Sequence, residues 1–386
     1  MADADVTEVH GMRCARIMGH TAPTAFQRTL LKHAAAASDT ACAQIMQSRP
    51  RTGKTIATAM GALLGVKVDV RHTQSVLLCS TIEQRDHTAW TVCRMLGKNA
   101  SRIRVLTATT DDTTHGRWDA VNIATAHVLI GCTGTIYQTV MNYPDTLKHV
   151  RFLAVHDADI MFGVAQTDQI MQISALVSTL CGNARMCFVS TVYDEGVLSC
   201  IRATVDGQST DVRDNETQTP EAGLRGREVE HMSVMVEREW KGDMVMHVIR
   251  WTIRTCQHAR VLVSCANGLQ VDRICDVISA VDRVDVVGLH GKSDRRRWMH
   301  RRVAQGGLGG RGLVVVSTEN IAHDARGRDF DVVVCSDAPF EIGGMIRLVS
   351  RAREKGKIVH LLTRDDVITF QRTMRAHGVH VTAFTD

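Results

Sequence analysis

The stretch that decides the fold is Phe152-Leu153-Ala154-Val155-His156-Asp157-Ala158-Asp159. Its first four residues are apolar, as in a strand buried on both faces, and an acidic cluster follows. About a hundred residues earlier stands Thr52-Gly53-Lys54-Thr55. A Gly-Lys-Thr loop followed by acids at the end of a buried strand is typical of sites that hold phosphates and a magnesium ion. Because His156 replaces the first acid, the sequence predicts a nucleotide site that is altered where the nucleotide would be cut.

The composition indicates a globular chain of more than one domain. At 386 residues, two domains are the default expectation. Apolar residues make up 44% of the chain and aromatic residues only 4%, so the cores must rest on aliphatic side chains. The net charge of +5 is mildly basic, which is compatible with a polyanionic partner but does not require one.

The sequence does not indicate a membrane protein or a protein with a cysteine-ligated metal site. No apolar stretch approaches the ~20 residues that span a bilayer, and the acidic start of the chain lacks a signal-peptide core. None of the 12 cysteines forms a Cys-x-x-Cys pair, and several stand inside apolar runs, as buried thiols of a reduced compartment do. We therefore expect no membrane partner and a cytoplasmic protein, with the nucleus as the alternative.

Short apolar runs, separated by amphipathic stretches, recur in two series. Such runs predict strands of a mostly parallel sheet covered by helices on both faces. The first series is Ser75–Cys79, Ile103–Leu106, His127–Ile130, Phe152–Val155 and Met186–Val189; the second is Val261–Cys265, Val284–Leu289, Leu313–Ser317, Val332–Cys335 and Ile358–Leu362. The predicted fold class is α/β, with two tandem domains of similar size.

A polar segment divides the two series. Asp206–Gly226 contains Pro220 and several glycines and cannot build a core, so we interpret it as the connection between domains. The expected boundaries are residues 1–205 for the first domain, 206–228 for the linker and 229–386 for the second domain.

The phosphate loop is predicted at Ser48-Arg49-Pro50-Arg51-Thr52-Gly53-Lys54-Thr55, directly before the helical run Ile56–Leu64. Backbone N–H groups at a helix start favour phosphate oxygens. Lys54 would add a charge for the β- and γ-phosphates, and the Thr55 hydroxyl would bind magnesium. The alternative interpretation is a chance Gly-Lys-Thr at a helix start.

Two residues of this loop depart from the usual pattern. Arg51 takes the place of a glycine that lets the backbone approach phosphate, and Pro50 removes an N–H donor. Ser48 replaces a small residue, which is a mild change. Two interpretations of Arg51 are open: it offers its own charge to phosphate, or it fills the cradle.

A series of motifs in order resembles the DEAD-box RNA helicases. Pro23-Thr24-Ala25-Phe26-Gln27 resembles the adenine-reading Q motif of that family. The further matches, in chain order, are Leu77–Glu83 and Val128–Thr135 at the two RNA-backbone motifs, His156–Asp159 at the D-E-A-D position, Ser190-Thr191-Val192 at the Ser-Ala-Thr position, and Leu289-His290-Gly291 before a basic helix. The resemblance covers the chain from Gly19 to about Thr363.

One octapeptide indicates a subfamily. Val236-Glu237-Arg238-Glu239-Trp240-Lys241-Gly242-Asp243 resembles the segment that opens the second domain of translation initiation factor 4A and its nuclear paralogue in the exon junction complex. Gln270-Val271-Asp272 resembles Lys-Val-Asp of the same group.

The resemblance to this family implies which ligands and which partners the protein binds. It implies two RecA-like domains that clamp single-stranded RNA and ATP, a role in translation initiation, and a factor 4G-like scaffold protein that bridges both domains of a monomer. The residues that it assigns to ATP are Gln27, Ser48, Arg51, Thr52, Gly53, Lys54 and Thr55, with Thr55 and Asp157 on Mg²⁺; it assigns catalysis to His156, Asp157, Arg351 and Arg353.

The acid box departs from the family in a way that bears on catalysis. In the family the first acid helps to hold magnesium and the second positions water. Imidazole is a poor ligand for magnesium, and Asp157 is one methylene shorter than glutamate. Loss of a well-placed base typically costs ~10²–10⁴ in rate. The favoured hypothesis is that His156 has drifted in a site with slow turnover; the alternative makes Asp157 the metal ligand and His156 the base.

The RNA path has also lost charge. The family's arginines in three RNA motifs correspond here to Ile82, Thr135 and Gly268. Each loss removes a phosphate contact, so we expect weaker RNA binding with a flatter salt dependence. A basic cluster at Arg295–Arg302 is either an RNA contact or a solvated helix face.

Two motifs have an open register. Motif V corresponds either to Ala322-His323-Asp324 or to Ala325-Arg326-Gly327. The arginine-finger motif is compressed to Ser350-Arg351-Ala352-Arg353, from which Arg351 and Arg353 are the candidates to reach the γ-phosphate.

Three hypotheses of function follow. The leading one is a divergent RNA-dependent ATPase and helicase of the factor 4A type with weakened hydrolysis and unwinding. The second is an enzyme of ordinary activity. The third is an inactive scaffold that keeps the fold for protein or RNA docking, although such a scaffold has no reason to keep Lys54, Thr55 and Gln27.

Overall fold

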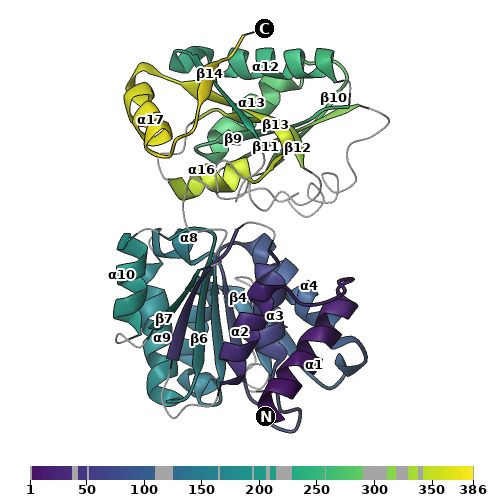
Figure 1. Ribbon diagram of the computed structural model, residues 1–386, viewed down its shortest axis with the longest axis vertical. Coiled ribbons are helices and arrows are strands. Elements are labelled where there is room, and N and C mark those ends of the chain that lie inside the picture. Colours follow the sequence, from purple (N-terminus) through teal and green to yellow (C-terminus); the bar gives the residue numbers. More distant parts are fainter. Residues whose placement is uncertain are drawn as a thin grey trace. The chain divides into compact units, whose positions relative to one another are not determined.

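The computed structural model describes the chain in two compact units, residues 1–215 and 216–386 (Figure 1). The residues described are 2–36, 42–49, 52–108, 125–163, 166–193, 195–205, 209–213, 228–256, 258–289, 311–318, 329–337 and 342–385. Each unit is an α/β domain built around its own sheet of seven strands.

The first domain alternates strands and helices along the chain. Its strands are β1 Cys42–Gln47, β2 Ser75–Cys79, β3 Val105–Thr107, β4 Val128–Cys132, β5 Phe152–His156, β6 Arg185–Ser190 and β7 Ser209–Arg213. Its helices are α1 Ala2–Ile17, α2 Ala25–Ala35, α3 Lys54–Leu63, α4 Ile82–Leu96, α7 Thr133–Asn142, α8 Ala158–Gly163, α9 Thr167–Leu180 and α10 Glu195–Thr204, with 3₁₀ turns η1 Gly97–Asn99 and η2 Pro144–Leu147. In Figure 1 the helices α1 to α4 cover one face of the sheet, and α9 and α10 cover the other.

The second domain follows the same alternation. Its strands are β8 Glu230–Met235, β9 Arg260–Cys265, β10 Val284–Leu289, β11 Gly312–Thr318, β12 Phe330–Cys335, β13 Ala352–Leu362 and β14 Val381–Ala383. Its helices are α12 Lys241–Thr255, α13 Gly268–Ile278, α16 Ile342–Val349 and α17 Arg364–Ala376, preceded by the 3₁₀ turn η4 Arg238–Trp240.

The two sheets have the same topology. The first has the strand order β3-β4-β2-β5-β6-β1-β7 and the second β10-β11-β9-β12-β13-β8-β14. Numbered within its own domain, each order is third, fourth, second, fifth, sixth, first, seventh. Within the described residues the strands pair in parallel, so the carboxyl ends of the strands meet at one edge of each sheet. The predicted tandem RecA-like architecture is confirmed.

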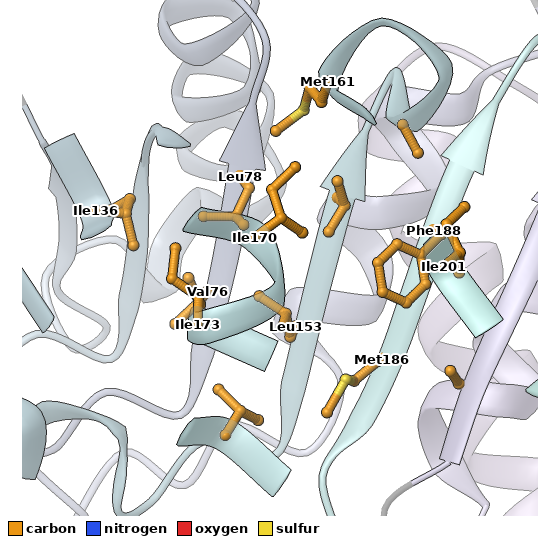
Figure 2. Packing of buried hydrophobic residues seen from close by; sticks show 14 of the residues in the cluster. Val76, Leu78, Ile136, Leu153, Met161, Ile170, Ile173, Met186, Phe188 and Ile201 are labelled. Atoms are coloured by element: carbon orange, nitrogen blue, oxygen red, sulfur yellow. The ribbon is translucent and has the colours of Figure 1, made fainter. Parts of the chain in front are cut away.

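The core of the first domain lies on both faces of its sheet because successive strand residues point to opposite sides. Along β2, Val76 and Leu78 pack against the α7–α9–α10 side, whereas Leu77 and Cys79 pack against the α1–α4 side. Figure 2 shows the first of these clusters, in which Phe188 of β6 and Ile170 of α9 also lie. The low aromatic content of the chain is therefore matched by a core made mostly of aliphatic side chains.

Four strands were not predicted from the apolar runs: β1, β7, β8 and β14. In β1 the run is interrupted by Gln44, and in β8 by His231, although both side chains are buried. Strand β7 lies inside the segment expected to be a linker. It pairs with β1 at the edge of the sheet, where Val212 packs on the core. Because an edge strand needs few apolar residues, its polar sequence did not reveal it. The rest of the expected linker is mostly outside the described residues, and the exact domain boundaries stay a prediction.

Candidate nucleotide-binding site

The predicted nucleotide motifs meet at the carboxyl edge of the first sheet. Strand β1 ends at Gln47 and leads into the phosphate loop, β5 ends at His156, and β6 ends at Ser190. β6 lies between β1 and β5 in the sheet, and the Ser48 N–H donates to the Ser190 carbonyl at 3.1 Å. Motifs separated by more than a hundred residues are therefore adjacent in space, at the edge where ligands of open parallel sheets bind.

The described part of the phosphate loop is held by its own polar groups. The Lys54 ammonium donates to the carbonyls of Ser48 at 3.0 Å and Arg49 at 2.8 Å. The Ser48 hydroxyl donates to Thr52 Oγ1 at 2.7 Å, and that hydroxyl donates to the Arg49 carbonyl at 2.9 Å. Lys54 is the first residue of α3, and its side chain therefore points back to the loop. Pro50 and Arg51 lie outside the described residues, so whether Arg51 binds or fills the cradle stays open.

Gly53 is required by the backbone of this loop. It is the N-cap of α3 with φ of 84°, a left-handed conformation that glycine adopts without strain. A Cβ at this position would clash with Gln27 Nε2. The Thr55 hydroxyl follows in the first turn of α3. The Gly-Lys-Thr is therefore a built loop–helix junction, with another part of the chain pressed against its glycine.

That other part of the chain is the start of α2. Gln27 is 2% exposed and forms a capping box with Thr24: its Oε1 accepts from the Thr24 N–H at 2.9 Å, and its own N–H donates to Thr24 Oγ1 at 3.2 Å. Its Nε2 also donates to the Gly53 carbonyl at 3.4 Å. The residue expected to read adenine is thus fixed against the phosphate loop.

His156 is buried and hydrogen-bonded at the end of β5. It is 2% exposed, and its Nε2 lies 2.7 Å from Thr58 Oγ1 of α3. Burial lowers the pKa of His156 to about 4; the nearby Lys54 also lowers this pKa, while Asp157 opposes the shift. At neutral pH the ring is therefore uncharged.

The bond to Thr58 occupies the Nε2 atom in either tautomer. The Thr58 hydroxyl also lies 3.1 Å from the Thr55 carbonyl, and its single hydrogen can serve only one acceptor. If that hydrogen goes to the carbonyl, the ring donates its own N–H to Thr58; otherwise the ring accepts. Such a ring is a poor ligand for a hard cation, and its burial disfavours the protonated form that a general base must reach.

Asp157 has an unusual backbone and a second partner. Its φ of 47° is in the left-handed region, and its carbonyl accepts from the N–H groups of Ile160 at 3.0 Å and Met161 at 3.1 Å at the start of α8. Its Oδ2 accepts a short hydrogen bond from Gln84 Nε2 of α4. Gln84 Oε1 in turn accepts from the Ser80 N–H at 2.9 Å. The carboxylate is thereby oriented from the motif that follows β2.

Thr58 and Gln84 were missed from the sequence. Thr58 stands four residues after Lys54, on the same face of α3, and this spacing could have revealed it. Gln84 stands three residues after the helix cap Thr81, whose Oγ1 accepts from the Gln84 N–H at 3.1 Å. A Thr-x-x-Gln pattern is a helix-start signal, but it does not reveal a contact with a residue 73 positions away.

The expected RNA-path positions carry no charge. Ile82 is the first residue of α4 and 42% exposed, Thr135 is buried in the first turn of α7, and Gly268 begins α13. The basic cluster Arg295–Arg302 and both registers of motif V lie outside the described residues.

The two candidate arginine fingers lie at the amino edge of the second sheet. The Arg351 carbonyl accepts from the Phe330 N–H at 2.9 Å, and Phe330, the first residue of β12, pairs with Ala352. The Arg353 guanidinium forms an ion pair with Asp331. Because β12 runs from this edge toward Cys335, both arginines are at the opposite end from the carboxyl edge of their own sheet. Their role as fingers stays a prediction.

The carboxyl edge of the second domain carries a different polar group. The Lys241 ammonium donates to Asp337 Oδ1 at 2.8 Å, and Asp337 Oδ2 accepts from the Ala266 N–H at 3.1 Å. Gln270 Oε1 accepts from the same N–H at 3.0 Å. These contacts tie α12, β9 and the segment after β12 together through an internal ion pair.

The class that the fold and site define is a protein of two tandem RecA-like domains with a phosphate loop in the first. A model of the DEAD/DEAH box helicase family matches residues 24–197, that is, the first domain from the Q motif to α10. The first domain is therefore similar to this family of helicases.

Solved structures share the fold over almost the whole chain. The Saccharomyces cerevisiae protein Dbp5 bound to RNA and ADP BeF3 is 16% identical, with a TM-score of 0.77, and the match covers 97% of this chain and 93% of that one. The DEAD-box helicase Mss116 bound to single-stranded RNA and UDP-BeF is 14% identical, with a TM-score of 0.80 and coverage of 97% and 77%. A variant of S. cerevisiae Dbp5 bound to a Gle1 variant and IP6 is 16% identical, with a TM-score of 0.67 and coverage of 98% and 92%.

Among the described residues, no helix is both long enough and apolar enough to cross a membrane.

Proposed function

We propose that this protein is a divergent DEAD-box protein of the factor 4A type that binds ATP and single-stranded RNA between its two domains and hydrolyses ATP slowly or not at all. The observation that carries the proposal is a contrast within one site. Lys54, Gly53 and Gln27 form an intact phosphate-loop junction, whereas the first acid of the neighbouring box is a neutral, buried imidazole bonded to Thr58.

Binding is supported by the parts of the site that remain. The start of α3 supplies backbone N–H groups and the positive end of the helix dipole for phosphate oxygens. Lys54 is beside them and would exchange its two carbonyl partners for the phosphates. Gln27, already fixed against Gly53, would read the adenine edge.

Magnesium is supported by two hard oxygen donors. The Thr55 hydroxyl and the Asp157 carboxylate are the groups that would hold it, and bound Mg²⁺ would neutralise charge on the phosphates. Within the described residues, no cluster of three or more His, Cys, Asp and Glu side chains could hold a metal ion by itself. The remaining ligands of the ion would come from the phosphates and from water.

Hydrolysis is disfavoured by what the chain's own residues can do with a proton. Asp157 is oriented by Gln84 but is one methylene shorter than the family glutamate, and the pKa of His156 is lowered to about 4 in a buried position. Neither side chain is well suited to take a proton from an attacking water. We expect a loss of ~10²–10⁴ in rate against a site with a well-placed base.

The proposed RNA binding, partner protein and location in the cell rest on the resemblance to translation initiation factor 4A. The uncharged Ile82 and Thr135 predict weak RNA binding, and the octapeptide Val236–Asp243 favours translation initiation with a factor 4G-like scaffold. A variant of S. cerevisiae Dbp5, which shares this fold, is bound to a Gle1 variant, so a protein of this fold binds another protein. We propose a cytoplasmic monomer.

The test separates binding from turnover. ATP affinity and RNA-stimulated ATP turnover are measured on the same sample of the full chain. The proposal predicts measurable affinity with turnover far below that of an ordinary helicase. An ordinary rate would refute the impaired site, and absent affinity would favour a scaffold that binds no nucleotide. The scaffold is kept as the second candidate because Arg353 is paired with Asp331 rather than placed at the carboxyl edge.

A further inference from the structure

We propose that the amino edge of the first sheet carries a second anion site, which binds a small ligand with several phosphate groups. A cavity of about 530 Å³ lies there. Its volume falls within the ~300–1,000 Å³ that is usual for small-molecule sites. The residues that line it are Lys67, Val70, Gln74, Lys148, His149, Val150, Arg151, Leu180, Cys181, Gly182 and Asn183.

The cavity is separate from the nucleotide site. Its walls come from the segments just before β2, β5 and β6, whereas the phosphate loop follows the carboxyl end of β1 and His156 is the last residue of β5. Because the strands are parallel, these are opposite edges of the same sheet. The predicted nucleotide motifs of the chain therefore do not use this cavity.

The lining carries charge of one sign. Lys67, Lys148 and Arg151 are exposed at the cavity, and no acidic residue lines it. Lys148 pairs with Asp145 at 2.9 Å, but both side chains are largely exposed, so that pair is weak. Among the described residues, no ion pair engages Lys67 or Arg151. Cationic groups around a concavity focus a positive potential and attract anions.

Two imidazoles add donors at the same edge. His149 lines the cavity and stacks on His72, with ring centroids 4.2 Å apart. Stacking holds the two rings together, and each offers an N–H to an oxygen acceptor.

The floor of the cavity is fixed by hydrogen bonds. The Gln74 side chain accepts from the Lys67 N–H and donates to the carbonyls of Lys67 and Val70, each at 2.8 Å. The Arg151 N–H donates to the Gln74 carbonyl at 2.8 Å, and the Arg185 N–H donates to the Arg151 carbonyl at 2.8 Å. Three strand starts are thereby joined, so the cationic side chains extend from a rigid base, which favours a specific site.

The chemical class of the ligand follows from this lining. The cavity is too polar for an apolar ligand, and three cations favour an anion with more than one charged group. Lysine and arginine both bind phosphate oxygens, arginine through two parallel N–H groups.

The test uses inorganic tripolyphosphate as the probe, titrated calorimetrically into the full chain at low salt. All proteins carry Lys54→Ala, so that the phosphate loop does not contribute. We expect saturable binding that Lys67→Ala with Arg151→Ala weakens about tenfold, because each exposed charge contributes a fraction of the affinity. The control Lys32→Ala with Arg372→Ala lowers the net charge equally at exposed positions elsewhere and should leave the affinity unchanged.

A second pair of variants avoids any loss of lining residues. A Cβ at Gly182 would meet nothing within 4 Å, so a side chain fits there without a clash. Gly182→Glu places a negative charge at the cavity and should abolish binding, whereas Gly182→Gln has the same size and should retain it. Equal affinity of these two variants, or equal loss in the charge-matched control, would overturn the proposal. A further outcome would also overturn the proposal of a small ligand. If single-stranded RNA displaces the probe, and Gly182→Glu abolishes binding of that RNA as well, the cavity is an RNA site.

Discussion

The two domains have the same strand order but different chemistry at their carboxyl edges. In the first, the edge gathers Lys54, Gln27, His156 and Asp157 around a loop–helix junction. In the second, the described part of the same edge carries the Lys241–Asp337 ion pair, and the described finger candidates lie at the other end of the sheet. The strand order therefore determines at which edge of a sheet a ligand site can form. The residues that follow each strand determine which chemical groups lie there.

The largest expected effect comes from Lys54→Ala. Loss of an ammonium that contacts the phosphates should weaken ATP binding about 100-fold, because charged hydrogen bonds contribute ~1.5–3 kcal/mol each. Equilibrium titration with a fluorescent ATP analogue measures it. Lys32→Ala, an exposed lysine of α2, is the control and should bind normally. Unchanged affinity in Lys54→Ala would show that the phosphate loop is wrongly assigned.

Acid should destabilise the first domain through its buried histidines. The pKa values of His156 and His33 are both lowered to about 4 by burial. An unfolded histidine titrates near 6.5, so between these values the unfolded chain binds more protons and stability falls as the pH drops. The loss per histidine reaches roughly 3 kcal/mol at pH 4.

Urea unfolding at several pH values measures this loss. The variant His156→Gln removes one titrating group, keeps a donor for Thr58, and should flatten the dependence between pH 6.5 and 4. A slope equal to that of the unsubstituted protein would count against a neutral, buried His156.

The phosphate-loop glycine can be tested against a glycine in open space. Gly53→Ala incurs both the left-handed φ and the contact with Gln27 Nε2, whereas Gly65→Ala has φ of 73° and meets nothing within 4 Å. Both should destabilise by about 1 kcal/mol from strain, and Gly53→Ala by more. Only Gly53→Ala should weaken ATP binding. Identical thermal shifts with intact binding in both would contradict the Gln27–Gly53 contact.

The smallest effect is expected from Arg353→Ala in the second domain. Its side chain is 56% exposed, so loss of the pair with Asp331 should change the free energy of unfolding by less than about 1 kcal/mol. If the placement at the amino edge holds, ATP turnover is also unchanged. Lost turnover with intact ATP binding would instead make Arg353 the finger and remove this difference between the domains.

Local patterns predicted most of the fold. Apolar runs such as Val284–Leu289 matched their strands, and the Gly-Lys-Thr junction formed at the start of α3 as expected. These features depend on neighbours in sequence. Strand β1 was missed because Gln44 breaks its apolar run, and β7 because an edge strand buries little.

The site was predicted less completely because its decisive contacts are tertiary. The sequence identified His156 and Asp157 as altered, but not that Thr58 and Gln84 would engage them. Thr58 carries a local signal only in its spacing from Lys54, and Gln84 carries none of its contact, because each pair meets only when separate strands end at one edge of the sheet. The compressed finger motif identified Arg351 and Arg353 as candidates, but it did not predict at which edge of the sheet they lie.

The most direct test of the central claim restores the acids. His156→Asp with Asp157→Glu is compared with the unsubstituted protein and with Asp157→Glu alone for RNA-stimulated ATP turnover at saturating ATP. We predict that turnover rises about 100-fold or more only in the double variant, because a carboxylate then stands in place of the neutral imidazole and a longer acid positions the water. An unsubstituted protein that already turns over ATP at the rate of the double variant would contradict the account.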